Sequence, residues 1–278
     1  MCEFAGPVAA ERAGVPWARV GIGLEWTADR FLRSAAPAVD RMRTSVGLAP
    51  DPDFRRWTDT PSFSLAPAGL EDPSVPGPGH VRRYRDDEEP TATLPDWWPG
   101  QDGPLVYVTF GSVAPAMPFF PGVFRGALDA LADLPVRVLM TIGRVRDPAE
   151  LGPLPANAHV EGWVRQADVE PHAAAIVCHG GFGTVRAGLA AGVPLVVVPL
   201  FADQPYNGRR VAALGAGETL GGGPAAVAGL RRAVERVLDD ATDAAAAARI
   251  AAENRALPPA EQAVEELRTL AASRALAA

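Results

Sequence analysis

The sequence predicts an α/β protein whose second half forms a doubly wound parallel sheet and whose first half contributes a partial α/β unit. Two observations support this prediction. Short runs that are apolar on both faces alternate with alanine-rich helical stretches in the second half, a pattern typical of parallel strands covered by helices on both sides. A stretch dense in Pro, Asp and Gly, over residues 49–102, separates these runs from the first half.

The sequence of the first half predicts only a few helices and strands. Apolar spacing indicates a helix over residues 7–13, a strand over residues 17–22 and a long amphipathic helix over residues 25–45, and a strand-like run follows at residues 80–84. A single strand and helix cannot bury both faces of a parallel sheet. We therefore expect this domain to be incomplete unless another chain completes it.

The second half predicts five strands, which are the runs LVYVTF, VRVLMTIG, AHVEGW, AIVCH and LVVVPL. We divide the chain into a partial α/β domain over residues 1–85, a linker over residues 86–103 and a complete α/β domain over residues 104–257. The remaining residues 258–278, rich in Ala, Glu, Leu and Arg and opened by two prolines, predict a helix that packs back on the first domain.

Composition narrows the class of protein. With 278 residues, 48% hydrophobic residues and a mean hydropathy near zero, the chain is expected to be a soluble globular protein with sizeable cores. No apolar stretch reaches the roughly 18–20 residues of a membrane helix, and the start, with Glu3 and no basic lead, does not resemble a signal peptide. We expect a cytoplasmic location.

Charge and cysteine content exclude several classes of function. The net charge of −7 argues against a nucleic-acid partner, because such binding depends on clustered basic residues. All 26 Lys+Arg positions are Arg, which excludes mechanisms that need an amine, such as a Schiff base or a phosphate-loop lysine. The two cysteines, Cys2 and Cys178, predict neither a disulfide framework nor a thiolate metal site.

The segment CHGGFGTVRAG is the strongest candidate site, because it follows a predicted strand and opens a predicted helix. In open α/β sheets, ligands bind beyond the carboxyl ends of the strands. His179 is expected at the strand tip, and Gly180, Gly181 and Gly183 are expected where the backbone approaches a ligand closely. Free N–H groups, the positive end of the helix dipole and the hydroxyl of Thr184 would meet a phosphate there.

Three further places lie just after predicted strands. Ser112 follows LVYVTF and offers a hydroxyl, although a Gly-Ser pair after a strand is more often just a turn. Trp163 and Gln166 offer an indole face and an amide that suit a nucleobase, and a core tryptophan is the alternative. Asp203 and Gln204 follow LVVVP and suit sugar hydroxyls, with a helix N-cap at Asp203 as the alternative.

Together these residues resemble the nucleotide-sugar signature of the family-one glycosyltransferases, the group that includes plant, macrolide and glucuronosyl transferases. The resemblance covers Leu105 to about Leu220, and His179 stands at the family's spacing from the Asp203-Gln204 pair. It implies the GT-B fold, in which a Rossmann-like, doubly wound C-terminal domain holds the donor and an N-terminal α/β domain holds the acceptor. The first of these is expected to be complete here and the second partial.

The resemblance implies a role for each matching residue. It places the nucleobase and ribose at Trp163, Val164 and Gln166, the donor diphosphate at Ser112, His179, Gly181, Gly183 and Thr184, and the donor sugar at Asp203 and Gln204. Two departures leave the base and the sugar open. Ala187 stands where many members carry a ribose-binding Glu, and Gly183-Thr184 replaces the plant Asn-Ser, as in bacterial relatives that act on dTDP-sugars or UDP-sugars. His172 falls on the family's earlier His, which is expected to be structural.

The implied activity is inverting, metal-independent transfer of a sugar from a UDP-sugar or dTDP-sugar to a hydroxyl of a small lipophilic natural product, with no other cofactor. The family's catalytic base is a His near the beginning of the acceptor domain. The chain is expected to start after that region, so we expect no catalytic residue within it and little or no activity from the chain alone. Asp51-Pro52-Asp53 spells the aspartate pair of metal-dependent glycosyltransferases, but its place in a Pro-rich loop predicts no metal site.

Two alternatives stay open. A noncatalytic partner of a complete glycosyltransferase, in a homodimer or heterodimer, is compatible with a missing base. An NAD(P)-binding oxidoreductase domain is compatible with glycines that open a helix after a strand. Against it, Arg186 stands where the third glycine of that motif belongs, and Asp203 follows a later strand.

Overall fold

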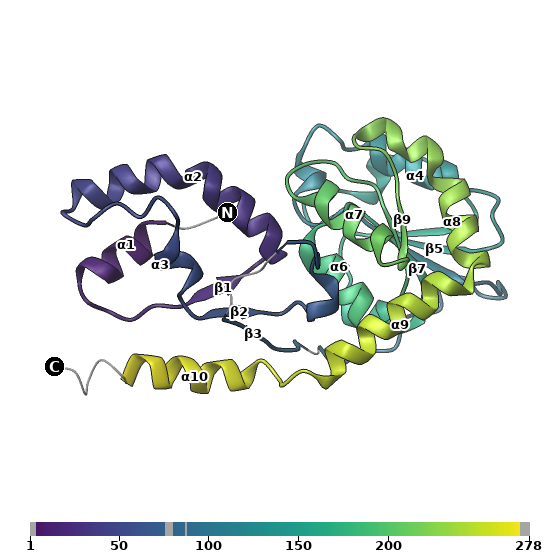
Figure 1. Cartoon of the computed structure of the whole chain (residues 1–278). Coiled ribbons are helices and arrows are strands. Elements are labelled where there is room, and N and C mark those ends of the chain that lie inside the picture. Colours follow the sequence, from purple (N-terminus) through teal and green to yellow (C-terminus); the bar gives the residue numbers. More distant parts are fainter. Residues whose placement is uncertain (1–3, 76–79, 87, 273–278) are drawn as a thin grey trace. The chain divides into compact units, whose positions relative to one another are not determined.

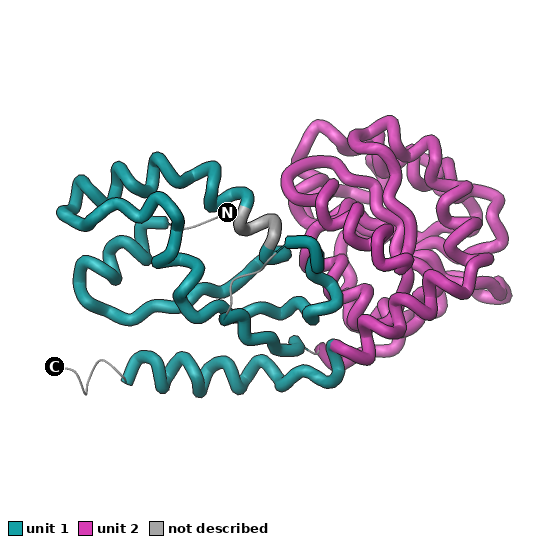
Figure 2. The backbone as a smooth tube through the Cα atoms, viewed as in Figure 1, with its two compact units in different colours: residues 1–87, 254–278 teal, residues 88–253 magenta. Residues whose placement is uncertain are grey.

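The computed structural model describes residues 4–75, 80–86 and 88–272, and the chain divides into two compact units (Figures 1 and 2). Unit 1 comprises residues 1–87 and 254–278, and unit 2 comprises residues 88–253. Cys2 and the last six residues of the predicted C-terminal helix lie outside the described residues.

Unit 1 contains a three-stranded parallel sheet in the order β1, β2, β3. Its elements are α1 (Ala5–Arg12), β1 (Arg19–Gly21), α2 (Glu25–Ser45), α3 (Arg55–Thr58), β2 (Ser62–Ser64), the 3-10 helix η1 (Ala68–Leu70), β3 (Val81–Arg83) and α10 (Glu261–Ala272). The helix predicted over residues 25–45 coincides with α2. The central strand β2 lies in the stretch predicted as loop, because three residues are too few to show a period of two.

The core of unit 1 forms around Trp57, which is 4% exposed. The rings of Phe4, Trp17 and Phe54 meet it edge-on, with centroids 5.2, 5.3 and 6.2 Å from its own. Edge-to-face contacts of this kind stabilise a cluster beyond the area that it buries. The cluster also contains Val8, Leu32 and Val39.

Arg43, in the last turn of α2, joins that helix to α1. Its guanidinium is 3% exposed and pairs with the carboxylate of Glu11, whose pKa the hydrogen bond from Arg43 lowers. Its Nε also donates to the carbonyl of Ala49 at 2.8 Å. The buried guanidinium of Arg43 therefore has both a carboxylate and a carbonyl as hydrogen-bond partners. A buried charge is tolerated when it is paired in this way.

The helix α10 is attached to the β3 side of unit 1. Arg85 forms a parallel bridge with Pro259, just before the helix begins. The hydroxyl of Tyr84 donates to the carboxylate of Glu266 at 2.6 Å, and Arg82 pairs with the same carboxylate. Burial and the neighbouring carboxylate raise the pKa of Tyr84 to about 12.

Unit 2 is a six-stranded parallel sheet in the order β6, β5, β4, β7, β8, β9. Its strands are β4 (Leu105–Thr109), β5 (Arg137–Thr141), β6 (Ala158–Glu161), β7 (Ala173–Cys178), β8 (Leu195–Val197) and β9 (Gly217–Thr219). Its helices are η2 (Ala114–Ala116), α4 (Gly122–Leu131), η3 (Pro148–Leu151), α5 (Gln166–Val169), η4 (Glu170–His172), α6 (Phe182–Ala190), α7 (Gln204–Ala213), η5 (Pro224–Gly229), α8 (Leu230–Asp239) and most of α9 (Ala241–Ala256). The five predicted strands are all present, and the doubly wound parallel sheet is confirmed.

The strand order of unit 2 reverses between β4 and β7. The chain runs outward through β5 and β6, then returns to the other side of β4 for β7, β8 and β9. Connections leave in opposite directions at such a reversal, and the carboxyl ends of the two strands flank the place where open α/β sheets bind ligands. The residues that follow β4 and β7 therefore lie at the favoured position.

The two faces of this sheet are covered by different helices. Val106, Val108 and Met140 belong to a buried cluster that includes residues of α4 and α8. On the opposite face α6 packs so closely that a Cβ on its Gly188 would lie 2.9 Å from side-chain atoms of Ile176 and Leu195. Both faces of the parallel strands are thus buried, as their continuous apolar character requires.

Strand β9, which pairs with β8, has a glycine that no other residue can replace without rearrangement. Gly217 has φ of 142°, and a Cβ there would lie 1.8 Å from the carbonyl oxygen of Leu195. The sequence prediction missed β9 because its three residues, GET, carry no apolar run.

Residues 88–103, predicted as a linker, are packed as part of unit 2. The amide of Thr91 donates to the carboxylate of Asp168 at 2.6 Å. Further along, the ring of Trp97 stacks on His159 of strand β6 with centroids 4.7 Å apart.

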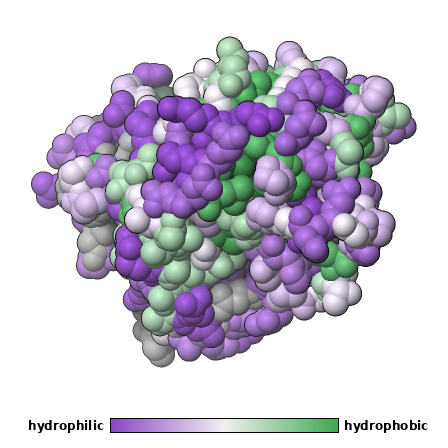
Figure 3. Space-filling model, turned by 90° about the vertical axis from the view of Figure 1, so that its right-hand side faces the viewer, coloured by the Kyte–Doolittle hydropathy of each residue, from purple (hydrophilic) through white to green (hydrophobic). Residues whose placement is uncertain are grey.

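The surface is mixed in character. Viewed from one side, hydrophilic residues surround a smaller apolar area (Figure 3). Of the helices within the described ranges, none combines the length and the apolar character needed to cross a bilayer.

Replacement of Arg43 by Ala is expected to destabilise unit 1 by on the order of 3 kcal/mol, because Glu11 would lose its buried partner. Urea denaturation followed by tryptophan fluorescence measures this loss. Arg41→Ala, at an exposed position of the same helix, is the matched control and should leave the transition unchanged. Equal transitions for the two variants would contradict this prediction.

Candidate functional site

The imidazole of His179 occupies the reversal point of the unit 2 sheet. His179 follows β7, and Gly111 follows β4 on the neighbouring strand. A Cβ on Gly111 would lie 2.7 Å from the imidazole Cε1, and one on Gly181 would lie 2.5 Å from its Nε2. The ring therefore fits between two glycines, and the exposed Ser112 lies in the turn beside it.

His179 is held as a neutral imidazole. Burial lowers its pKa to about 4, and the nearby carboxylate of Asp203 opposes that shift only in part. Its Nδ1 is buried and has no hydrogen-bond partner among the described residues. A neutral ring keeps one N–H donor and one acceptor nitrogen, so it hydrogen-bonds an anion without carrying a charge of its own.

The N-terminus of α6 follows His179 directly. Gly181 is the N-cap residue, and within the described part of the chain no side chain caps this helix. The first-turn amides of an uncapped helix point outward with the positive end of its dipole. Gly183 is exposed, with nothing within 4 Å of an added Cβ, whereas Thr184 is 8% exposed. An anion that approaches these amides meets bare backbone at Gly183.

Asp203 and Gln204 open helix α7, after β8. Asp203 stands at the N-cap position but its side chain makes no capping bond, so the capping alternative does not describe it. Its Oδ2 instead accepts from Nδ2 of Asn207 at 3.0 Å. Gln204 is 2% exposed, and its Oε1 accepts from the amides of Leu200 and Phe201 at 2.8 and 2.9 Å. Gln204 thus fixes the loop that leads to Asp203.

Trp163 follows β6 and is 54% exposed, so it is not the core tryptophan of the alternative interpretation. The guanidinium of Arg144, after β5, lies 4.2 Å from the centroid of its ring. Val164 and Gln166 follow and are half-buried. Gln166 begins α5 and interacts with the hydroxyl of the buried Tyr107.

A buried carboxyl lies on the 3-10 helix that precedes β7. Glu170 is 6% exposed, and its Oε1 has no hydrogen-bond partner within the described residues. Burial raises its pKa to about 7, while the charge of Arg186 in α6 opposes the shift. Because Glu170 comes before β7 and His179 comes after it, this carboxyl is not one of the residues at the carboxyl edge of the sheet.

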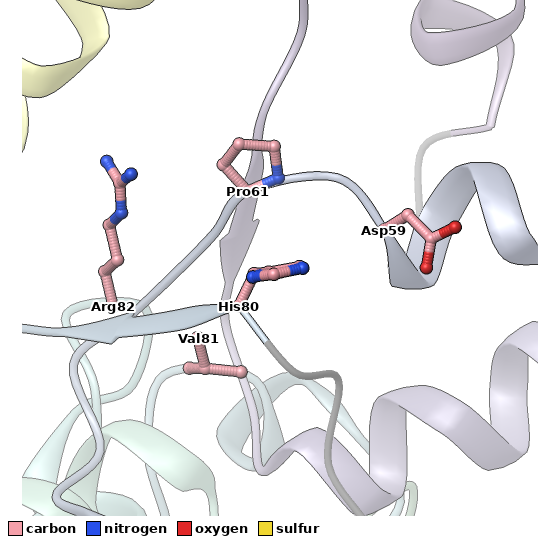
Figure 4. A pocket seen from close by; sticks show the side chains of 5 residues that line it. All are labelled: Asp59, Pro61, His80, Val81 and Arg82. Carbon is pink, nitrogen blue, oxygen red and sulfur yellow. The ribbon is translucent and has the colours of Figure 1, made fainter.

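A hollow of about 350 Å³ lies in unit 1 and is lined by Asp59, Pro61, His80, Val81 and Arg82. In Figure 4 the side chain of His80 points toward the side of Asp59, and Arg82 points elsewhere. Pro61 precedes β2 and His80 precedes β3, so the hollow lies at the amino ends of these strands. Ligands in open parallel sheets bind at the opposite edge, so this hollow is not the site that the sequence predicts.

Groups of three or more metal-ligating side chains are absent from the part of the chain that the structure describes. The carboxylate of Asp51, one of the aspartates considered for a metal, accepts from the amides of Arg55 and Arg56 at 3.0 Å and so caps α3.

The structure brings most of the predicted residues to one edge of the sheet, the carboxyl edge. Close contacts between side chains and turns join the loops after β4, β7 and β8, and the loop after β6 carries Trp163 at the same edge. Two residues near these loops, Arg144 and Asn207, were not predicted from the sequence. Arg144 directly follows a predicted strand, and Asn207 stands four residues after Asp203 on a helix, so both carried a positional signal.

Comparison with known proteins places this site in a family. Residues 125–270 match the family model described as "Erythromycin biosynthesis protein CIII-like, C-terminal domain". The chain is 37% identical over 145 residues to demethyllactenocin mycarosyltransferase of Streptomyces fradiae, covering 52% of this chain and 31% of that protein. It is 34% identical over 262 residues to L-demethylnoviosyl transferase of Streptomyces niveus, covering 92% of this chain and 66% of that protein.

Among solved structures, the chain resembles the glycosyltransferase VinC in complex with dTDP, with a TM-score of 0.72 and 27% identity over 96% of this chain and 69% of that one. The architecture is therefore that of the GT-B glycosyltransferases, as predicted. The chain belongs to the family of the erythromycin biosynthesis protein CIII-like C-terminal domain, which confirms the resemblance found in the sequence. It spans from about one third to two thirds of the length of the two curated relatives named above.

Replacement of Gly181 by Ala is expected to displace the imidazole of His179, because the new Cβ would lie 2.5 Å from Nε2. Overpacking of this kind costs about 1–3 kcal/mol, so the melting temperature should fall. Gly183→Ala, two residues further in the same helix turn, meets open space and is the matched control. Thermal denaturation by circular dichroism compares the two, and equal melting temperatures would show that the ring is not confined by Gly181.

Replacement of Glu170 by Gln is expected to stabilise the protein at pH 8 and not at pH 4.5. The pKa of Glu170 is about 7 in the folded protein and near 4.5 in the unfolded chain. The stability that this carboxyl contributes is therefore fully present below pH 4.5 and is lost as the pH rises through 7. Gln does not ionise, so the gain at pH 8 should be about 3 kcal/mol. Denaturation curves at the two pH values measure it, with exposed Glu235→Gln as the control; a gain that is equal at both pH values would be the contrary result.

Proposed function

We propose that unit 2 binds the nucleotide-sugar donor of an inverting, metal-independent glycosyltransferase, with a UDP-sugar or dTDP-sugar as the co-substrate. The observation that carries this proposal is the neutral His179, packed between Gly111 and Gly181 at the head of an uncapped helix. A diphosphate placed there receives amide hydrogens from the first turn of α6 and one from the imidazole. The departing diphosphate is stabilised in the same way, without a metal.

The two ends of the donor have matching surroundings in this proposal. The nucleobase stacks on the exposed indole of Trp163, with Val164 and Gln166 beside base and ribose. The sugar hydroxyls meet the carboxylate of Asp203 and the Nε2 of Gln204, whose Oε1 is already held by the amides of the preceding loop. Ser112 and Thr184 add hydroxyls around the diphosphate. These roles rest on the positions of the residues at one sheet edge and on the family to which the chain belongs.

The names of the relatives support transfer to a natural product. Two are sugar transferases of Streptomyces, and the solved VinC structure holds dTDP. By extension, we propose that the acceptor is a hydroxyl of a small lipophilic molecule and that the protein works in the cytoplasm. The oxidoreductase alternative is not favoured by these relatives. A noncatalytic role beside a complete glycosyltransferase, in a dimer, is the second candidate, because the base that the resemblance places near the start of the acceptor domain has no assigned residue in this chain.

Isothermal titration calorimetry with UDP, dTDP and GDP tests the proposal. Wild-type protein should bind at least one of the three. His179→Ala should weaken that binding about ten-fold or more, as loss of a hydrogen bond to a charged group does. Trp163→Ala should weaken it by about 1–3 kcal/mol, the usual contribution of stacking on one base.

Trp97→Ala is the matched control for the indole, because Trp97 stacks on His159 and is not among the proposed donor-binding residues. The Trp97→Ala protein should bind the nucleotide with the same affinity as the wild type. Binding that survives both His179→Ala and Trp163→Ala unchanged would rule out the proposed site.

A further inference from the structure

Asn207, in the first half of α7, is a fully buried side chain with an unusual set of partners. Its Nδ2 donates to the carbonyl of Gly180 at 2.9 Å and to Oδ2 of Asp203 at 3.0 Å. An amide nitrogen carries two hydrogens, so both are used. The reversed amide would place Oδ1 against two acceptors, and the orientation is therefore fixed by chemistry.

Burial of the Asn207 amide costs free energy, and packing alone gives no reason for an asparagine at this position. The Oδ1 of Asn207 is buried with no hydrogen-bond partner in the described part of the chain. A buried acceptor without a partner costs about 1–3 kcal/mol. An apolar side chain of similar size would avoid that cost. The two hydrogen bonds that Nδ2 donates therefore indicate what the asparagine contributes.

The carboxylate of Asp203 is directed by Asn207 away from its usual place. An aspartate at an N-cap position normally accepts from the amides of its own helix, and Asp203 does not. The residue before it, Ala202, has φ of 54°, in the left-handed region that non-glycine residues seldom adopt. The backbone on one side and Asn207 on the other thus fix where the carboxylate lies.

The turn that Asn207 contacts is packed against the same helix. Gly180 has φ of 86°, and a Cβ there would lie 2.7 Å from Val197 and 3.0 Å from the carbonyl oxygen of Gln204. The turn that carries His179 therefore rests on the start of α7. Asn207 adds a hydrogen-bonded bridge across this close contact, from Gly180 to Asp203.

We propose that Asn207 is a positioning residue that fixes the Asp203 carboxylate relative to the His179 turn and so sets where the donor's sugar must lie when its diphosphate is bound. The proposal rests on the proposed function. Without Asn207, the carboxylate of Asp203 turns back to cap α7, the diphosphate contacts persist, and the sugar loses its partner.

The experiment compares binding of a nucleoside diphosphate with binding of its glucose ester. Calorimetry gives Kd for dTDP and dTDP-glucose, and for UDP and UDP-glucose, and the better-bound pair is used. Kd for the nucleoside diphosphate divided by Kd for its glucose ester measures the contribution of the sugar to binding. Asn207→Ala should lower this ratio about five- to ten-fold, which is the effect of one hydrogen bond to a charged group. Kd for the diphosphate itself should change by less than about two-fold.

Three further variants make the result specific. Asp203→Ala should lower the ratio to the same extent, and the double variant should lower it no further, because Asn207 acts through Asp203. Asn157→Ala is the matched control, because the Nδ2 of Asn157 also donates to two acceptors, the carbonyls of Leu131 and Leu134, and its Oδ1 also lacks a partner among the described residues. It should leave the ratio unchanged.

The contrary outcomes are distinct. Equal weakening of both ligands by Asn207→Ala would make Asn207 a structural support of the turn, and an unchanged ratio, or an additive double variant, would also overturn the proposal. If Asn207→Ala does not fold, Asn207→Ser, which keeps one donor, is judged by the same ratio. Wild-type protein that binds no nucleoside diphosphate would overturn the proposed function itself, whereas intact diphosphate binding with an unaltered ratio would overturn only the role of Asn207.

Discussion

The contact of one imidazole with two glycines governs the carboxyl edge of the unit 2 sheet. His179 fills the space that side chains at Gly111 and Gly181 would need, so the turns after β4 and β7 approach each other only because both lack a Cβ. Those two strands are neighbours at the reversal of strand order, where connections leave in opposite directions. The sheet topology opens a space at this point, and the glycines allow a histidine to enter it.

Two buried polar side chains at this edge lack a hydrogen-bond partner for one of their atoms among the described residues. They are His179, through its Nδ1, and Asn207, through its Oδ1. Each such group lowers stability, since it has given up water without a replacement. Local rules of stability are broken in this way where function needs a particular side chain. His179 and Asn207 belong to the turn and the helix that a hydrogen bond joins at this edge, which agrees with the assignment of the site.

The sequence was informative wherever a residue's position follows from the strand that precedes it. The runs ending near Thr109, Cys178 and Val197 predicted buried parallel strands, and the residues beyond them then had to meet at one edge. Strands β2 and β9 were missed, because three-residue strands pair through backbone geometry and need no apolar pattern. The bridge made by Asn207 was also beyond prediction, because it depends on a contact between a helix and a turn that are distant in the sequence.

The backbone of Gly217 has a consequence for how this family member can vary. An oxygen of the neighbouring strand occupies the volume of any side chain, and the torsion angle itself is one that L-amino acids rarely adopt. Among random codon replacements at this position, selection for folded protein would favour glycine strongly, even though the position contacts no part of the donor in our proposal. Invariance at such a position in an alignment would therefore reflect the geometry of strand pairing and would be misleading as a guide to ligand contacts.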